Sequence, residues 1–368
     1  MWGKTSARTG TIYACPVSGY SYCESLYAAA RALGIDVREG VWLGRWLFSH
    51  LHAGDVLHLH WPSFLYYDQE SRWRSTIGLV RFIMTCLLLR LRGVRIWWTA
   101  HNLYPHDGGR SVWMHRVARR FVVRVASRIF VHGASVAAIV RDEFGVAPSL
   151  LTIVPHGNWI GVYPNTLTRF QARERLGLPQ PAHVFLFIGL CKPYKGLDSL
   201  IETMSRLETG AVLLIAGKFP TAAYEKRLRD LAQRLGSGRV RVCPGFIDDA
   251  DMQVFLNAAD TVVLPYREIL TSGAAMLAMS FGRPVVAPRM GGLVDQIADG
   301  CGLLYDHADP DGLLNALRAA RSSRFSEEFI LGTAAASTWE DAARALAVTC
   351  AGRPSDAATE TASGTAQP

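Results

Sequence analysis

The chain has 368 residues, which is more than one ordinary hydrophobic core needs and enough for two domains of typical size. Its composition, 49% hydrophobic and 19% charged, is that of a folded globular protein and excludes a fibrous or wholly disordered one. The seven cysteines are scattered without a Cys-x-x-Cys pair. This spacing argues against a disulfide scaffold or a cysteine-ligated zinc site and favours a reduced protein.

The net charge of +8 is unevenly distributed. Residues 1–155 contain 18 Lys and Arg against 9 Asp and Glu, whereas the remaining 21 basic and 22 acidic residues balance. Between Arg72 and Arg128 twelve arginines accompany one acidic residue, Asp107. A basic half on a neutral half predicts an anionic partner, and nucleic acid and anionic lipid both qualify at this point.

The amino-terminal residues lack the apolar core of a secretion signal. The longest apolar stretch, 77–91, is interrupted by Arg81 and Arg90, so it is far shorter than the ~20 residues of a membrane-spanning helix. The segment 112–128 predicts a basic amphipathic helix, a pattern that suits an anionic membrane surface. The alternative is a helix that packs its apolar side chains on a sheet and leaves its arginines in water.

Short apolar runs alternate with helical patterns along the chain, which predicts an α/β protein with parallel sheets. In the first half we expect strands at 11–15, 55–60, 95–99, 128–132 and 151–154, and helices near 21–33, 72–92, 111–127 and 134–143. In the second half we expect strands at 184–188, 211–216, 240–243, 261–264, 284–287 and 303–305, and helices near 195–207, 221–235, 249–258, 272–281 and 308–320.

These elements predict two Rossmann-like, doubly wound parallel-sheet domains that face each other across a cleft. We expect the first domain over 1–160 and the second over 161–352, with a linker near 155–166. The small, polar residues 353–368 have the composition of a disordered tail.

Ligands of open parallel sheets bind beyond the carboxyl ends of the strands, where helices begin. Two loops at such positions in the second domain combine glycine with cations or hydroxyls: Gly189, Lys192 and Lys195 in one, and Arg267, Thr271, Ser272 and Gly273 in the other. Backbone N–H groups, the helix dipole and the lysines all favour an anion, so the two loops together predict a diphosphate site. Taken singly, each has a plainer interpretation, as a solvated lysine loop or as simple helix capping.

Together with DVLHLHWP at 55–62, TAHNLYPH at 99–106 and His156-Gly157 in the first half, these loops resemble GT-B glycosyltransferases of the family 4 and family 94 type, in particular the β-mannosyltransferases of xanthan-type exopolysaccharide assembly. The resemblance covers roughly residues 10–320. It implies transfer of a sugar, with mannose as the first candidate, from a GDP- or UDP-linked donor to a lipid-linked oligosaccharide. It also implies a cytoplasmic enzyme, peripheral on the inner face of the plasma membrane, that needs no cofactor beyond its nucleotide-sugar substrate.

One departure from the family 4 pattern bears on the mechanism. Two glutamates of the last donor motif hold the nucleotide ribose and the sugar in those enzymes, and the matching positions here are Leu277 and Ile269. Their absence favours an inverting mechanism, in which a base deprotonates the acceptor hydroxyl and cations stabilise the departing diphosphate. A catalytically silent protein that binds a nucleotide sugar is the alternative.

The catalytic base is expected at a strand end of the first domain. His101 follows the strand 95–99 and matches the position where related GT-B enzymes place a histidine near the donor sugar. With an ordinary pKa of about 6.5 it would accept a proton near neutral pH. Asp107 is the second candidate base. The plainer alternatives are a histidine that bonds its own loop and an aspartate in a turn before two glycines.

Candidate acceptor-binding residues lie at or after the ends of the first two strands: Ser18, Gly19 and Tyr20 after one, and His60 and Trp61 at the end of the other. Because side chains alternate along a strand, His58 and His60 share a face, where burial is the usual outcome.

Asp249-Ala-Asp251 has the spacing of a metal-binding motif. Acidic residues at the start of a helix interact favourably with its dipole, so we expect no metal here. A nucleic-acid-binding protein would explain the arginines but leaves the two loops unexplained and shows no known nucleic-acid module, so we expect no nucleic-acid partner.

Overall fold

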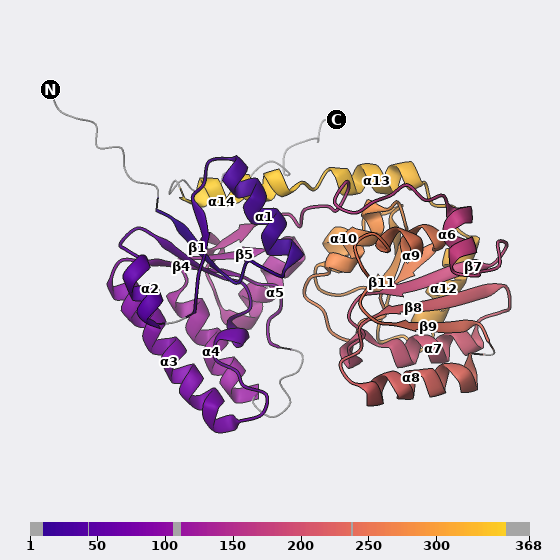
Figure 1. The fold of residues 1–368 in the computed structure, drawn as a ribbon, viewed down its shortest axis with the longest axis horizontal. Coiled ribbons are helices and arrows are strands. Elements are labelled where there is room, and N and C mark those ends of the chain that lie inside the picture. Colours follow the sequence, from indigo (N-terminus) through magenta and orange to yellow (C-terminus); the bar gives the residue numbers. More distant parts are fainter. Residues whose placement is uncertain (1–9, 43, 106–111, 237, 351–368) are drawn as a thin grey trace, which may run out of the picture. The chain divides into compact units, whose positions relative to one another are not determined.

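The computed structural model describes residues 10–42, 44–105, 112–236 and 238–350. The chain divides into two compact units, one made of Met1–Gly157 with Thr338–Pro368 and the other of Asn158–Ser337 (Figure 1). The predicted α/β class is confirmed, because each unit is built on a six-stranded parallel sheet flanked by helices. Asp107 and the predicted tail 353–368 lie outside the described residues.

The first unit has the strand order β2-β1-β3-β4-β5-β6, and all its described pairings are parallel. Its strands are β1 Ile12–Cys15, β2 Val37–Glu39, β3 Val56–Leu59, β4 Arg95–Thr99, β5 Arg128–Val131 and β6 Leu151–Ile153. Its helices are α1 Ser21–Ala32, α2 Gly44–His50, α3 Arg72–Leu91, α4 Val112–Val125, α5 Ala134–Phe144 and α14 Trp339–Cys350, with 3-10 turns at Pro62–Leu65 and Pro148–Leu150.

The second unit has the strand order β12-β11-β10-β7-β8-β9, again parallel. Its strands are β7 His183–Ile188, β8 Ala211–Gly217, β9 Val240–Pro244, β10 Thr261–Val263, β11 Val285–Pro288 and β12 Gly302–Tyr305. Its helices are α6 Arg169–Arg175, α7 Leu197–Arg206, α8 Ala222–Leu235, α9 Met252–Ala258, α10 Gly273–Ser280, α11 Leu293–Gln296, α12 Gly312–Ser322 and α13 Glu327–Ala335, with a 3-10 turn at Pro193–Lys195.

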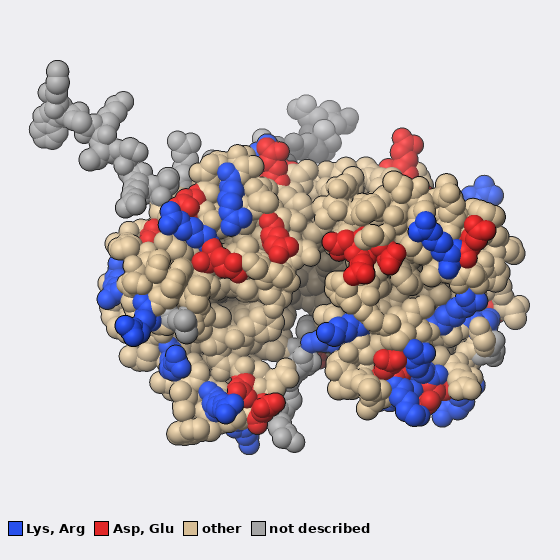
Figure 2. Space-filling view, in the orientation of Figure 1, with Lys and Arg blue, Asp and Glu red and all other residues tan. Residues whose placement is uncertain are grey.

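Central strands of both sheets are buried on both faces, which explains their nearly continuous apolar sequences. All four residues of β3 and all but the first residue of β7 are buried. The three-residue edge strand β2 was not predicted from the sequence, because only Val37 of its residues is buried and no alternating pattern marks it. On the face drawn in Figure 2, basic and acidic side chains of the second unit lie interspersed.

The last helix departs from the expected domain ranges, which placed residues 161–352 together. Helix α14 packs against α1, and its Ala342, Ala343 and Leu346 are buried in one core cluster with Leu26 and Tyr27 of the first unit. The physical reason is that α14 carries an ordinary amphipathic pattern, and such a pattern fits the open side of either sheet. The first unit is therefore discontinuous in sequence.

Candidate active site

The two glycine-containing loops of the second unit come together in the structure. They leave β7 and β10, which are paired neighbours in the sheet. Arg267 N–H donates to the carbonyl of Tyr194 over 2.9 Å. Gly196 has a φ of +71°, and a Cβ atom there would lie 2.0 Å from the carbonyl oxygen of Pro265. The close approach of the loops therefore requires glycine at this position.

Lys195 lies where these two loops meet. Its Nζ is 3.9 Å from the ring centroid of Tyr266 and 5.0 Å from that of Tyr194. Burial lowers the pKa of the Lys195 ammonium, an effect that Tyr194 opposes. An ammonium that has lost part of its hydration gains more from an anion than a fully solvated one, because the local dielectric is lower.

The other candidate donor residues divide into two groups. The Arg267 guanidinium forms an ion pair with Asp198 over 2.8 Å and also donates to Ser199 Oγ over 3.2 Å, so it tethers the second loop to α7. Ser272 is the N-cap of α10, where its Oγ accepts from Ala275 N–H. Gly273 and Thr271 are half-buried beside it, and Gly189 is exposed with a φ of +126°. Lys192 is half-buried at the start of the Pro193–Lys195 turn.

In the first unit, a histidine stands at or just beyond the carboxyl end of four neighbouring strands. These are His60 after β3, His101 after β4, His132 after β5 and His156 after β6. His60, His132 and His156 are buried, whereas His101 is half-buried. Neighbouring parallel strands end at the same edge, so the topology brings the four imidazoles together.

Several predicted residues of the first unit are in direct contact with one another. The Trp61 ring stacks on His101 with centroids 4.4 Å apart and an interplanar angle of 15°. The Tyr20 ring also packs against Trp61, with ring centroids 4.7 Å apart. His60 Nδ1 lies 2.9 Å from His101 Nε2. The structure thus places Tyr20, His60, Trp61 and His101 in one group.

Ser18 and Gly19 have a different role in the described contacts. Ser18 donates through its backbone N–H and its hydroxyl to the Glu39 carboxylate, over 3.1 and 2.7 Å. Gly19 N–H donates to Glu24 over 2.9 Å. These bonds fix the loop that carries Tyr20, and both residues stay exposed.

The expectation of an ordinary pKa for His101 is wrong. Burial holds the pKa of its imidazole well below the usual value, and the nearby His132, His156 and His58 and the Arg119 guanidinium act in the same direction. His101 is therefore neutral at pH 7, and it remains able to accept a proton at a pH at which an exposed histidine is already charged.

His132 was not predicted as a member of this group, and the burial of Arg119 on α4 was not predicted either. The available signal was the repetition itself, since a histidine follows four successive strand patterns. Arg119, expected among the solvent-facing arginines of 112–128, is buried. Its Nε donates to the Leu103 carbonyl over 2.7 Å and its guanidinium lies 4.5 Å from the Trp98 ring centroid. Asp249 and Asp251 are exposed just before α9.

Comparison with known proteins gives these sites a context. Residues 182–322 match the model of the glycosyl transferases group 1 family. The chain is 28% identical over 273 residues to a GDP-mannose:glycolipid 4-beta-D-mannosyltransferase of Xanthomonas campestris pv. campestris, covering 72% of each chain. It is 31% identical over 247 residues to a D-inositol 3-phosphate glycosyltransferase of Streptosporangium roseum, covering 63% of this chain and 56% of that protein.

Solved structures confirm the fold. The structure of Alr3699/HepE from Anabaena in complex with UDP and glucose superposes with a TM-score of 0.70 at 18% identity, over 93% of this chain and 99% of that one. The match spans both units, and the sequence match to the group 1 model lies within the second. The chain is a glycosyltransferase with the GT-B fold, and residues 182–322 of its second unit match the group 1 glycosyl transferases.

Proposed function

We propose that this glycosyltransferase moves a hexose, with mannose as the first candidate, from a nucleotide-sugar donor to a lipid-linked oligosaccharide of bacterial exopolysaccharide assembly. The observation that carries the proposal is the meeting of the β7 and β10 loops around Lys195, combined with likeness to an enzyme named for GDP-mannose and a glycolipid. GDP- and UDP-linked sugars both fit a cationic loop of this kind, because it recognises the diphosphate.

Lys195 and the N-terminus of α10 bind the donor diphosphate in this proposal. The lysine supplies a full positive charge with little hydration to displace, and α10 supplies backbone N–H groups and its dipole. Both stabilise negative charge that grows on the diphosphate as the bond to the sugar breaks. Arg267 acts indirectly, since its ion pair with Asp198 holds the loop in place.

His101 is the proposed base that takes the proton of the acceptor hydroxyl. It is neutral, half-buried and held by His60 and Trp61, which fixes its orientation. In the inverting reaction the acceptor oxygen attacks the anomeric carbon, its proton passes to the imidazole, and the diphosphate leaves with the electron pair of the broken bond. Asp107 remains the second candidate for the same role.

A donor screen tests the proposed function directly. Purified protein is incubated with GDP- and UDP-linked hexoses and a polyprenyl-diphosphate oligosaccharide, and the anomeric configuration of the product is determined by NMR. We expect transfer from one GDP-hexose with inverted configuration. Retained configuration would refute the mechanism, and transfer from none of the donors would refute the substrate class.

Activity is expected to be independent of divalent metal, because Lys195 and a helix N-terminus take the place of Mg²⁺ at the diphosphate. The measurement is the transfer rate in excess EDTA, compared with untreated enzyme. We expect the same rate in both. Complete loss that Mn²⁺ or Mg²⁺ restores would contradict this and make Asp249 and Asp251 candidate metal ligands.

The first unit also has a surface that fits an anionic membrane, and the proposal includes this as the place where the lipid-linked acceptor is reached. Helix α3 buries one apolar face against the core and exposes a second. The exposed stripe consists of Trp73, Ile77, Val80, Met84, Leu87, Leu88 and Leu91. Their spacing of three and four residues places them on one side of the helix. Arg74, Arg81 and Arg90 are exposed along its borders, where they can meet lipid phosphates.

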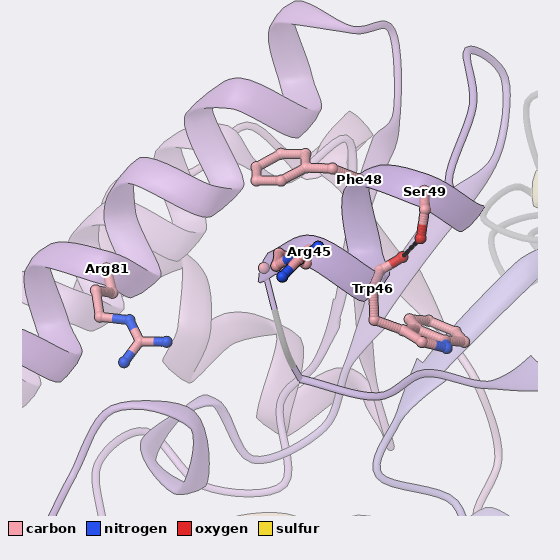
Figure 3. Close-up of a pocket in the computed structure, with 6 residues that line it drawn as sticks. Arg45, Trp46, Phe48, Ser49 and Arg81 are labelled. Atoms are coloured by element: carbon pink, nitrogen blue, oxygen red, sulfur yellow. Dashed lines mark hydrogen bonds between the residues drawn. The ribbon is translucent and has the colours of Figure 1, made fainter.

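An open pocket beside this stripe also combines apolar side chains with arginines. It has a volume of about 800 Å³ and is lined by residues of α2 and by Arg81 of α3 (Figure 3). Phe48 and Trp46 give it apolar walls, and Arg45 and Arg81 bring two guanidinium groups to it. No described helix is long and apolar enough to cross a bilayer. The apolar stripe and arginines therefore support binding at the interface.

Replacing Val80 and Met84 by glutamate is expected to weaken binding to phosphatidylglycerol vesicles by about tenfold or more, because two exposed apolar side chains that would contact the lipid become charges that anionic lipid repels. Vesicle flotation measures the bound fraction. The matched control is Phe246→Glu in the second unit, which also replaces an exposed apolar residue and is expected to bind as wild type. Equal binding of the wild type, the Val80/Met84 double variant and Phe246→Glu would exclude α3 as the membrane surface.

A further inference from the structure

Five side chains of the first unit form one continuous hydrogen-bonded chain, which joins Thr99 to His101. Thr99 Oγ1 lies 2.8 Å from His58 Nε2, and His58 Nδ1 lies 2.7 Å from the Tyr27 hydroxyl. The same hydroxyl lies 2.6 Å from His60 Nε2. His60 Nδ1 is in turn 2.9 Å from His101 Nε2. His58 and His60 each use both ring nitrogens within this chain, and His101 joins it through Nε2.

The inner members of this chain are shielded from water. Thr99, His58, Tyr27 and His60 are each no more than 1% exposed. Burial lowers the pKa of His58 to about 3, and it holds the pKa values of His60 and His101 well below normal. The three imidazoles are therefore neutral at pH 7, so each carries a single N–H and its other nitrogen can only accept.

Tyr27 couples the three imidazoles because its hydroxyl has one proton and two histidine partners. If it donates to His58 Nδ1, it must accept from His60 Nε2, and His60 Nδ1 then accepts from His101 Nε2. If it donates to His60 instead, every bond reverses. In the first arrangement all three rings carry their proton on Nε2, and in the second all three carry it on Nδ1. A mixed set leaves a buried donor or acceptor unsatisfied, which is costly.

Only the first arrangement leaves His101 with a lone pair on the ring nitrogen that does not bond to His60, as a base requires. We propose that Tyr27 and His60 are positioning residues that hold the proton of His101 on Nε2, so that Nδ1 is the atom that accepts the proton of the acceptor hydroxyl. This inference rests on the role of His101 as base proposed above. When the acceptor O–H bond breaks, an N–H bond forms at Nδ1 and His101 becomes an imidazolium that still donates from Nε2 to His60. Thr99 closes the far end of the chain by accepting from His58.

Nitrogen-15 NMR of histidine-labelled protein reads the tautomers, with His58, His60 and His101 assigned by single replacements with glutamine. His132 provides an internal reference of the opposite kind, because its Nδ1 lies 2.9 Å from the Val154 carbonyl oxygen, which can only accept. We expect Nε2–H on His58, His60 and His101 and Nδ1–H on His132. Different tautomers among the first three, or Nδ1–H on His101, would overturn the proposal.

Tyr27→Phe removes the coupling hydroxyl and keeps the ring. Although Tyr27 does not bond to His101, the variant is expected to change the nitrogen shifts of His101 and to lower kcat about threefold to tenfold, with KM for the donor unchanged. The control is Tyr22→Phe, a buried tyrosine whose ring lies 4.6 Å from His101 but whose hydroxyl has no hydrogen-bond partner among the described residues. It should leave the His101 shifts and kcat unchanged.

The two proposals fail in different ways. If His101 is not the base, its replacement leaves kcat intact while the NMR coupling through Tyr27 is still seen. If the coupling is absent, Tyr27→Phe and Tyr22→Phe give the same His101 shifts and the same kcat, while replacement of His101 still abolishes transfer. That second result would overturn the positioning role of Tyr27.

Discussion

Replacement of His101 by glutamine is expected to lower kcat by about two to four powers of ten, the usual contribution of a general base, with donor affinity unchanged. Glutamine keeps a polar group beside His60 but cannot take up a proton at this pH. Single-turnover transfer measures the rate, and donor titration measures the affinity. Because burial lowers the pKa of His101, we further expect the wild-type rate to persist below pH 6.5, where an ordinary histidine becomes charged and inactive as a base.

The control is His52→Gln, an exposed histidine just before β3 at the opposite end of the strand from His60, which should turn over as wild type. Asp107→Asn distinguishes the two candidate bases. Loss of transfer in Asp107→Asn with a near-normal rate in His101→Gln would reverse the roles. Near-normal rates in both variants would remove both candidates.

Replacement of Lys195 by alanine is expected to lower transfer by about a hundredfold, with the fold intact. One charge-assisted contact to a diphosphate contributes about 2–3 kcal/mol, and the partly desolvated position of this ammonium puts it at the upper end of the range. Lys192→Ala should have a milder or similar effect. Donor titration by calorimetry and steady-state transfer together measure the loss.

Lys226→Ala removes the same charge from the same unit at an exposed ion pair with Asp230 on α8, and it should leave transfer unchanged. A rate in purified Lys195→Ala equal to that of wild type would rule out the proposed diphosphate site. An equal loss in both variants would show that overall charge, not the position of Lys195, is what matters.

Much of the second unit could be predicted from the sequence, because its signals are local. Buried parallel strands appear as short apolar runs, and Gly189 and Gly273 mark the loop and the helix start that follow β7 and β10. Knowing that ligands bind at the carboxyl ends of strands was then enough to select both loops. Their direct contact through Gly196 and Pro265 needed the strand order, which the sequence alone does not give.

The site in the first unit was predicted only in part, since its histidines are far apart in sequence. His60 and His101 stood out because each follows an evident strand, whereas the bond between them depends on β3 and β4 being neighbours in register. Tyr27 gave no signal at all, because a tyrosine on the buried face of α1 is ordinary core composition. The burial of Arg119 was missed for a similar reason, as helical periodicity does not reveal what covers a helix.

Helix α14 has a consequence for how the protein is made. Its residues 339–350 are synthesised after the whole second unit, yet Ala342, Ala343 and Leu346 complete the core that contains Leu26 and Tyr27. Residues 158–337 are all synthesised before α14. The second unit therefore has all its helices and strands before the first unit does, although it begins later in the sequence. A nascent chain halted after residue 337 would carry a complete second unit and a first unit whose apolar surface is still open to chaperones or proteases. The first unit can therefore complete its core only after the second unit has been synthesised.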